Sequence, residues 1–320
     1  MKVTSKVLLI MGHVFLFFIG IISCQVSTSA DNNQYEMTNL QGLYFGQSLP
    51  GNIPKIFAAE IISAAENENY YVQSPAGDEV FFMKVINRNG NGFGIIYHSK
   101  LLNGFWTKPA IASFSGNYSE GYLAMHPDGS RLYFSSERPI GQSESVYNSN
   151  IWYVEKVNEI WGNPKPVGRP INGRNNTSGP SVTRDGTLYY TESRNNGSSE
   201  IYRSKYINGI YQEPEKLSAK INSSIQQFDS YIAPDESYLI YQAYLRTGSY
   251  GGTDLYISFR DSMDNWSPSV NMGSAINSSH DESSPTITVD KRYVFYTKYN
   301  NANNGMDIYW FNSDYLNSLK

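Results

Sequence analysis

The sequence contains 320 residues, of which 29 are acidic and 25 basic, and its formal net charge is −4. Nucleic acid binding needs clustered Lys and Arg to neutralise phosphates, so an acidic chain without such clusters excludes a nucleic acid partner. The length allows one large domain, and the single cysteine excludes an internal disulfide.

The first 24 residues have the layout of an export signal. Lys2 and Lys6 precede an apolar run from Val7 to Ser23, which is the pattern of a secretory signal peptide. Ser23 directly before Cys24 resembles a bacterial lipobox, which implies that Cys24 is lipidated and becomes the mature N-terminus. A plain signal peptide or a short membrane anchor is the alternative. We therefore expect a lipid-anchored protein of the cell envelope, on the outer membrane, facing either the periplasm or the surface.

The segment after the cysteine differs in character from the rest of the chain. The stretch "QVSTSADNNQ" from Gln25 is polar and has no apolar periodicity, which is typical of a flexible tether. We predict a signal peptide over residues 1–23, a tether over 24–39 and a single folded domain over 40–320. Removing residues 1–23 deletes two lysines and lowers the formal charge from −4 to about −6.

One tight hairpin recurs along the predicted domain. A polar turn precedes an aromatic strand in "SPAGDEVFF" from Ser74, "HPDGSRLYFSSE" from His126, "TRDGTLYY" from Thr183, "APDESYLIY" from Ala233 and "TVDKRYVFY" from Thr288. The equivalent turn residues are spaced by 52, 57, 50 and 55 residues, namely Gly77, Gly129, Gly186, Glu236 and Lys291. A nearly fixed period of this length indicates a repeat architecture.

Each repeat holds about four short strands, and no helical periodicity follows the signal peptide. Units of about 50 residues with four strands are typical of β-propeller blades. The strand "RLYFSS" from Arg131 is apolar or aromatic on both faces, which suits a sheet packed between two neighbours. We predict an all-β fold, a single propeller of five four-stranded blades. Six blades are the alternative if residues 35–50 contain hidden strands.

The two ends of the domain complement each other. The last repeat, "DIYWFNSDYLNSLK", lacks the proline-led strand of the others, and a matching segment, "GNIPKIFAAEIIS", begins at Gly51. We predict that this N-terminal strand completes the last blade. Closing the ring in this way removes free sheet edges, which otherwise invite aggregation.

These repeats resemble the WD40-like repeat, also called PD40, of TolB-type propellers, over roughly residues 40–311. The shared pattern is an Asp-Gly turn followed by "LYF", "DIY" and a Trp-Pro-led strand, and the opening "GLYFGQSLPGNIPKIFAAEIIS" resembles PD40 lipoproteins of Bacteroidetes type. The resemblance implies a propeller that acts as an interaction module. Glu236 and Lys291 depart from the pattern where glycine is usual, so we expect turns of another type there.

Charged residues near one rim of the predicted propeller form the candidate ligand-binding site. The connections between the second and third strands and those between blades share this rim, and they are the long, polar ones. Arginines follow the second strands at Arg138, Arg194 and Arg246, and acids lie near the starts of the first strands at Glu120, Asp229, Asp281 and Glu282. Converging arginines would bind a carboxylate or phosphate. The alternative is that these charges pair with one another and hold the blades in register.

Signals for catalysis or a metal are weak in this sequence. Glu137 and Glu192 end second strands and resemble a glycosidase pair only in residue type. The histidines of the predicted mature chain, His98, His126 and His280, have no ligand-like spacing, so we expect no metal site and no cofactor.

The sequence therefore predicts a lipid-anchored binding module of the cell envelope, monomeric, whose partner is a protein, a peptide or a glycan. We expect binding rather than catalysis. The alternatives are a glycan-active hydrolase or lyase that uses acids at the channel mouth, and a purely structural envelope protein.

Overall fold

The computed structural model describes residues 36–64, 67–141, 149–173, 175–300 and 305–320. The predicted signal peptide, Cys24 and the tether up to residue 35 lie outside the described residues. Strand β1 (Met37–Gln41) begins inside the segment predicted as tether, so residues 37–39 are part of a strand.

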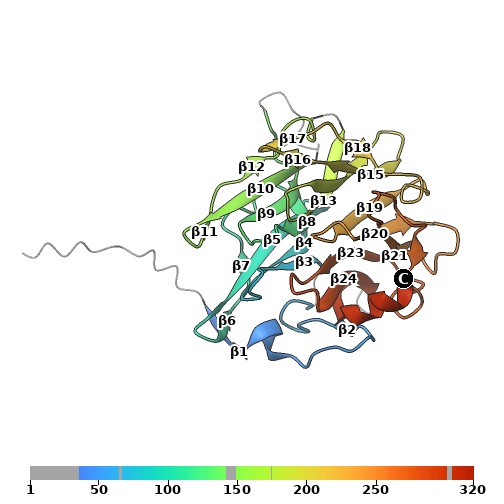
Figure 1. The fold of residues 1–320 in the computed structure, drawn as a ribbon. Helices are drawn as coiled ribbons and strands as arrows, with labels where there is room; N and C mark the ends of the chain where they lie inside the picture. Colours follow the sequence, from blue (N-terminus) through green and yellow to red (C-terminus); the bar gives the residue numbers. More distant parts are fainter. Residues whose placement is uncertain (1–35, 65–66, 142–148, 174, 301–304) are drawn as a thin grey trace, which may run out of the picture. The chain divides into compact units, whose positions relative to one another are not determined.

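Five antiparallel sheets form the five blades of a β-propeller, which confirms the predicted all-β fold and blade number. The blades follow one another in sequence order, from cyan through green and yellow to red in Figure 1. Residues 37–46 hold β1 and the 3-10 helix η1 (Leu43–Gly46), and β1 pairs with β6 (Phe105–Thr107) at the edge of blade 1. The six-blade alternative is therefore wrong.

The strands of each blade run from the centre outward in chain order. Blade 1 contains β3 (Asn67–Gln73), β4 (Glu79–Arg88), β5 (Asn91–Leu102) and β7 (Ala110–Ile111). Blade 2 contains β8 (Glu120–Met125), β9 (Arg131–Ser136), β10 (Asn150–Val157) and β12 (Lys165–Pro166), with β11 (Ile160–Trp161) also paired to β10. Blade 3 contains β13 (Asn176–Val182), β14 (Leu188–Ser193), β15 (Ser199–Ser204) and β18 (Glu215–Lys216), beside the hairpin of β16 (Tyr206–Ile207) and β17 (Ile210–Tyr211).

Blades 4 and 5 complete the ring. Blade 4 contains β19 (Gln227–Ile232), β20 (Tyr238–Tyr244), β21 (Thr253–Phe259) and β22 (Val270–Asn271). Blade 5 contains β23 (Glu282–Ile287), β24 (Tyr293–Asn300) and β25 (Gly305–Asn312), and β2 (Lys55–Ile56) is its fourth strand. The 3-10 helix η2 (Ser313–Leu319) follows β25.

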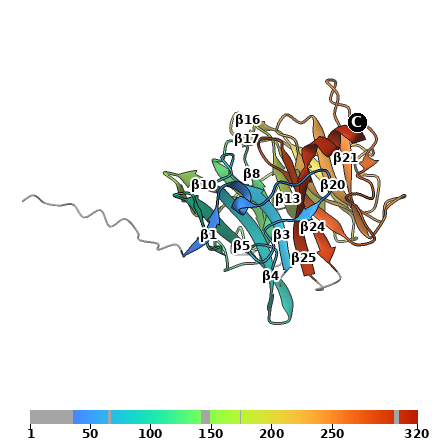
Figure 2. The same cartoon turned by 90° about the horizontal axis from the view of Figure 1, so that it is seen from below.

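The N-terminal strand closes the ring as predicted. β2 pairs antiparallel with β25, with Lys55 opposite Trp310 and Ile56 opposite Tyr309. The blue segment therefore lies beside the red one in Figures 1 and 2. The next residue, Phe57, is fully buried and packs edge-to-face on the rings of Phe295 and Trp310 at 4.9 and 5.1 Å. Such aromatic pairs add to the free energy gained by burying the rings, so this contact stabilises the packing of the segment after β2 against the last blade.

Short fourth strands are extended by an asparagine side chain. The amides of Asn172, Asn222 and Asn277 each accept a hydrogen bond from a backbone N–H of the third strand and donate one to a carbonyl there. The isoleucine before each asparagine is buried in the core. The repeated Ile-Asn pair is a signal that the repeat pattern alone did not reveal, and each asparagine follows the last residue of β12, β18 or β22 by six positions.

The five hairpin turns share one conformation, so the expectation of another turn type at Glu236 and Lys291 is wrong. In every turn the fourth residue donates its N–H to the carbonyl of the first, at 2.8–3.1 Å. The fourth residue has a positive φ whether it is glycine, as at Gly129 (77°), or not, as at Glu236 (57°) and Lys291 (60°). A left-handed conformation costs a residue with a Cβ about 1 kcal/mol, so other interactions must offset it.

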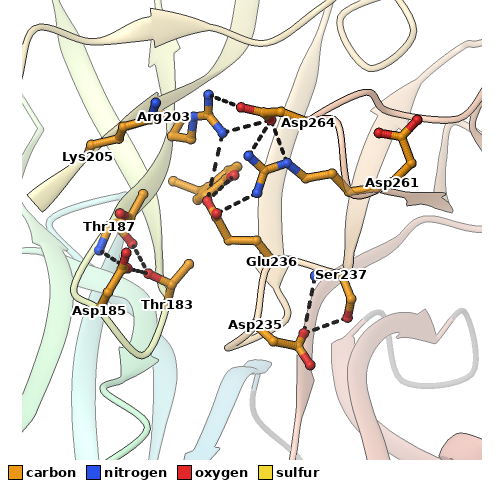
Figure 3. Close-up of polar contacts among 12 residues, drawn as sticks. Thr183, Asp185, Thr187, Arg203, Lys205, Asp235, Glu236, Ser237, Asp261 and Asp264 are labelled. Atoms are coloured by element: carbon orange, nitrogen blue, oxygen red, sulfur yellow. Dashed lines mark hydrogen bonds and ion pairs between the residues drawn. The ribbon is translucent and has the colours of Figure 1, made fainter.

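The side chain of Glu236 joins blades 3 and 4. It accepts a hydrogen bond from the Tyr189 hydroxyl at 2.7 Å and pairs with Arg260, and Arg203 lies 3.9 Å away. Arg203 of β15 also binds Asp264 of blade 4, at 3.1 Å (Figure 3). A glycine at position 236 could make none of these contacts. Lys291 forms a simpler bridge, a 2.9 Å pair with Asp235 of the preceding blade.

These two turns should respond oppositely to glycine. Glu236→Gly relieves backbone strain but removes the acceptor of the buried Tyr189 hydroxyl and one of the carboxylates that pair with Arg203 and Arg260, so we expect a net loss of about 1–3 kcal/mol of unfolding free energy. Lys291→Gly relieves the same strain and removes a pair whose side chains are 45% and 52% exposed. Such a pair contributes about 0–1 kcal/mol, so this variant should be as stable as the parent or slightly more stable. Denaturant unfolding of both variants checks the prediction, and equal losses would contradict it.

Candidate functional site

The central channel is lined by one unusual residue from each blade. The first strand of every blade has a register shift, and the residue within it has a positive φ. These residues are Tyr70 (51°), Tyr122 (56°), Gly179 (58°), Asp229 (35°) and Ser284 (54°). A bulge redirects a side chain at a chosen point of a strand. Here the five bulges determine which side chains enter the channel, and the five bulge residues line one cavity together.

Side chains close the channel at this level. The Tyr70 hydroxyl donates to Asp229 at 2.7 Å, and the rings of Tyr70 and Tyr122 lie 4.6 Å apart. A Cβ at Gly179 would come within 3.2 Å of the Asp229 carboxylate, so the absence of a side chain at this position gives the carboxylate enough space. The cavity has a volume of about 20 Å³, and the next cavity along the channel has about 50 Å³. Such volumes hold a few water molecules and no sugar ring.

Asp229 has an unusual environment for a carboxylate. Burial raises its pKa to about 7, although the hydroxyl groups of Tyr70 and Ser284 favour the charged form. Burial also raises the pKa of Tyr122 to about 12. Asp229 is therefore partly protonated near neutral pH and shares its site with neutral hydroxyl groups.

The predicted acids at the strand starts hold the linkers between blades. The Glu120 carboxylate lies 2.8 Å from Arg138, and burial raises the pKa of Glu120 while the Ser115 hydroxyl and Arg138 oppose that shift. Arg138 also donates to the carbonyl of Phe114, in the linker that leads into blade 2, and lies over the ring of Trp152 at 5.2 Å. The structure thus brings Glu120 and Arg138 together as an ion pair.

Glu282 occupies the position of Glu120 in blade 5. It accepts hydrogen bonds from the backbone and hydroxyl of Ser278 at 3.0 and 2.6 Å, and Lys298 lies 3.5 Å away. Burial raises the pKa of Glu282. The preceding residue, Asp281, is exposed and accepts a hydrogen bond from the Thr253 backbone at 2.8 Å. Both acids hold local loops in these contacts.

Arg194 and Arg246 lie against their own blades. Arg194 donates to the Tyr202 hydroxyl at 2.7 Å and lies 3.3 Å from Glu200. Arg246 donates to the Tyr241 hydroxyl at 2.5 Å and lies over the ring of Tyr256. Tyr202 and Tyr256 are in the third strands of blades 3 and 4, as Trp152 is in blade 2. These contacts fit the alternative in which the charges support the blades, and a ligand-binding role for the three arginines stays a prediction.

A ligand-sized groove lies at the opposite face, beside η2. Its volume is about 670 Å³, within the range of small-molecule sites. The aromatic and apolar part of the lining comprises Tyr238, Phe259 and Leu316, and the cations are Arg260, Lys291 and Lys320. The remaining lining residues are Ser237, Ser267, Ser313, Asp314 and Asn317. We call this site the C-terminal groove, and no sequence motif predicted it.

Ring closure creates the C-terminal groove. Because β2 supplies the fourth strand of blade 5, the segment after β25 does not return as a strand and instead forms η2. Leu316 of η2 is buried in a cluster with Ile240 of blade 4 and Phe311 of blade 5. The Tyr315 hydroxyl donates to the Met272 carbonyl at 2.7 Å, just after β22. η2 thus lies across the junction of blades 4 and 5 and forms one wall of the groove.

Two further observations concern metals and membranes. Among the described residues, no group of three or more His, Cys, Asp or Glu side chains could hold a metal ion. Within the same part of the chain, no helix has the length and apolar character needed to cross a membrane.

The fold and site define a five-bladed propeller whose channel is closed by side chains and which carries the C-terminal groove on one face. No protein-family model matches the sequence, and the search of curated proteins finds no relative. Solved structures that it resembles include TolB from Acinetobacter baumannii, at 16% identity and a TM-score of 0.47, over 78% of this chain and 55% of TolB. The present chain thus spans about half the length of TolB.

Two other neighbours match along most of their own length. A thermostable family-43 glycoside hydrolase is 12% identical with a TM-score of 0.45, over 82% of this chain and 91% of the hydrolase. A protein of unknown function from Dyadobacter fermentans is 11% identical with a TM-score of 0.48, over 81% and 96%. Similarities this remote concern the fold alone, so the function has to be argued from the residues of the site.

The buried Asp229 predicts a pH dependence of stability. Its pKa in the folded protein is about 7, above the ordinary value of 3.8, so the folded state holds the proton more tightly. The stabilising effect of this proton is complete below pH 4 and is lost as the pH rises to 7, at up to about 1.4 kcal/mol per unit. Asp229→Asn keeps an acceptor for Tyr70 and should flatten the profile between pH 4 and 7. Unfolding measurements across this range check the prediction, and parallel profiles for both proteins would contradict it.

Proposed function

We propose that the protein is a lipid-anchored binding module of the cell envelope, of the PD40 propeller type, that holds a protein, peptide or glycan without chemically changing it. One observation carries the proposal. The C-terminal groove, at about 670 Å³, is large enough for a ligand, whereas the two channel cavities formed by described residues measure only about 20 and 50 Å³. The groove is lined by aromatic, hydroxyl and charged side chains, which is the composition of a recognition site.

The carboxylates do not favour hydrolysis in the channel. A glycosidase of the usual kind needs two carboxyl groups about 5–10 Å apart on either side of an accessible substrate. Asp229 is the one carboxylate among the described residues that line the two channel cavities, and only 6% of its surface is exposed. Glu192, one of the acids that the sequence singled out, accepts a hydrogen bond from Asn175 at 2.6 Å and is 8% exposed. Binding is therefore preferred to catalysis.

The direct test of the binding function is a capture experiment. The purified full-length protein, immobilised, is incubated with a cell-envelope extract, and the retained proteins and glycans are identified by mass spectrometry. We expect at least one retained ligand to disappear from the Ser237→Trp variant, which fills the groove from an exposed position. Arg194→Ala tests the rim in parallel. Retention that neither variant changes, or turnover of a glycan by the protein, would contradict the proposal.

The anchor is proposed from the sequence, because Cys24 lies outside the described residues. Cys24→Ala should abolish labelling with a radioactive or clickable fatty acid and should release the protein from the membrane fraction. The parent protein and a neighbouring variant, Ser27→Ala, serve as controls for export and expression. Membrane association that persists in Cys24→Ala would show that the lipid anchor is not what holds the protein there.

A further inference from the structure

Two aromatic side chains line the C-terminal groove. Tyr238 and Phe259 both line it, and both are partly exposed. Their ring centres lie 6.4 Å apart and their ring planes are inclined by 56°, so each ring offers its own face to a ligand. Aromatic rings combine a wide apolar face with little conformational freedom, so they form rigid platforms. A platform of this kind suits the C–H face of a sugar ring, which is apolar although its edges carry hydroxyl groups.

The walls of the groove are rich in groups that both donate and accept hydrogen bonds. Three serine hydroxyls, at Ser237, Ser267 and Ser313, and the amide of Asn317 line it. The hydroxyls of Ser237, Ser267 and Ser313 donate to Asp235, the Pro268 carbonyl and the Lys291 carbonyl, so their oxygens are left to accept hydrogen bonds from ligand hydroxyls. The Asn317 amide nitrogen can donate one. Hydroxyl-rich ligands match this set of side chains better than extended apolar ones do.

The cations of the groove are largely compensated by acids of this chain. Arg260 pairs with Glu236 and binds Asp264 at 2.6 Å, and Lys291 lies 2.9 Å from Asp235. Lys320 donates to the Asn317 side chain, and Asp314 adds a negative charge to the lining. Because nearby opposite charges cancel much of the field of Arg260 and Lys291, the groove has little preference for an anion. A neutral ligand fits this balance.

We propose that the C-terminal groove binds a neutral oligosaccharide, with a sugar ring on Tyr238 and Phe259 and its hydroxyl groups bonded to the serine and asparagine side chains. The inference rests on the proposed binding function and specifies its ligand class. The volume of about 670 Å³ lies within the range of about 300–1,000 Å³ of small-molecule sites, so the groove can accommodate a short oligosaccharide. The channel plays no part in this binding.

The test uses ligand-observed NMR on the purified full-length protein. The probes are neutral gluco-, xylo- and manno-oligosaccharides of three to five units, with oligogalacturonate as the acidic counterpart. We expect at least one neutral probe to bind, and its affinity to fall tenfold or more in Ser237→Trp and Asn317→Ala, both at exposed positions. Tyr250→Ala is the matched control, because Tyr250 is an aromatic residue, 51% exposed, outside the groove lining. This control should bind as the parent does.

Each other outcome overturns the inference. If neutral probes bind both groove variants as tightly as the parent, the saccharide site lies elsewhere. If oligogalacturonate binds tenfold more tightly than every neutral probe, the ligand class is acidic. If the capture experiment yields a groove-dependent partner but no saccharide binds, the binding function is supported and the saccharide proposal is wrong. Absence of both kinds of ligand removes the binding function as well.

Discussion

The contact between the N-terminal strand and the last blade is the constraint on which the rest of this fold depends. A propeller blade is sandwiched between two neighbours, so a ring that is left open exposes both a sheet edge and an apolar face. β2 covers the edge of β25, and Phe57 seals the junction against Phe295 and Trp310. Residues separated by about 250 positions in the sequence are thus joined in one blade.

This closure also shapes the proposed ligand site. Because the fourth strand of blade 5 comes from the N-terminal segment, the residues after β25 are available to form η2 and one wall of the groove. The channel, by contrast, is closed by the bulge residues, above all by the Tyr70–Asp229 pair. The proposed recognition site therefore lies at a blade junction, where the aromatic ends of β20 and β21 meet a short 3-10 helix.

The fold could be predicted because its signals repeat with a fixed period. Five aromatic hairpins and the complementary ends predicted the blade number and the closure, since each blade must bury the same two faces. The predicted change of turn type at Glu236 and Lys291 was wrong, because residues other than glycine can also adopt a positive φ. At Glu236, contacts with Tyr189 and Arg203 across the blade junction offset the strain.

The site was harder to predict, because side-chain direction and distant neighbours decide it. The spacing of Arg138, Arg194 and Arg246 gave their place in the blades, but nothing in the spacing showed that each guanidinium group contacts an aromatic residue of its own blade. The groove combines residues from two blades and η2, and no local sequence motif predicts such a junction.

The role of ring closure is tested most directly by unfolding two shortened chains in guanidinium chloride, one starting at Glu36 and one at Ala64. We expect a single cooperative transition for the first chain and its loss for the second, which lacks β2 and Phe57. Equal midpoints and slopes for the two chains would contradict the claim that this closure holds the propeller together.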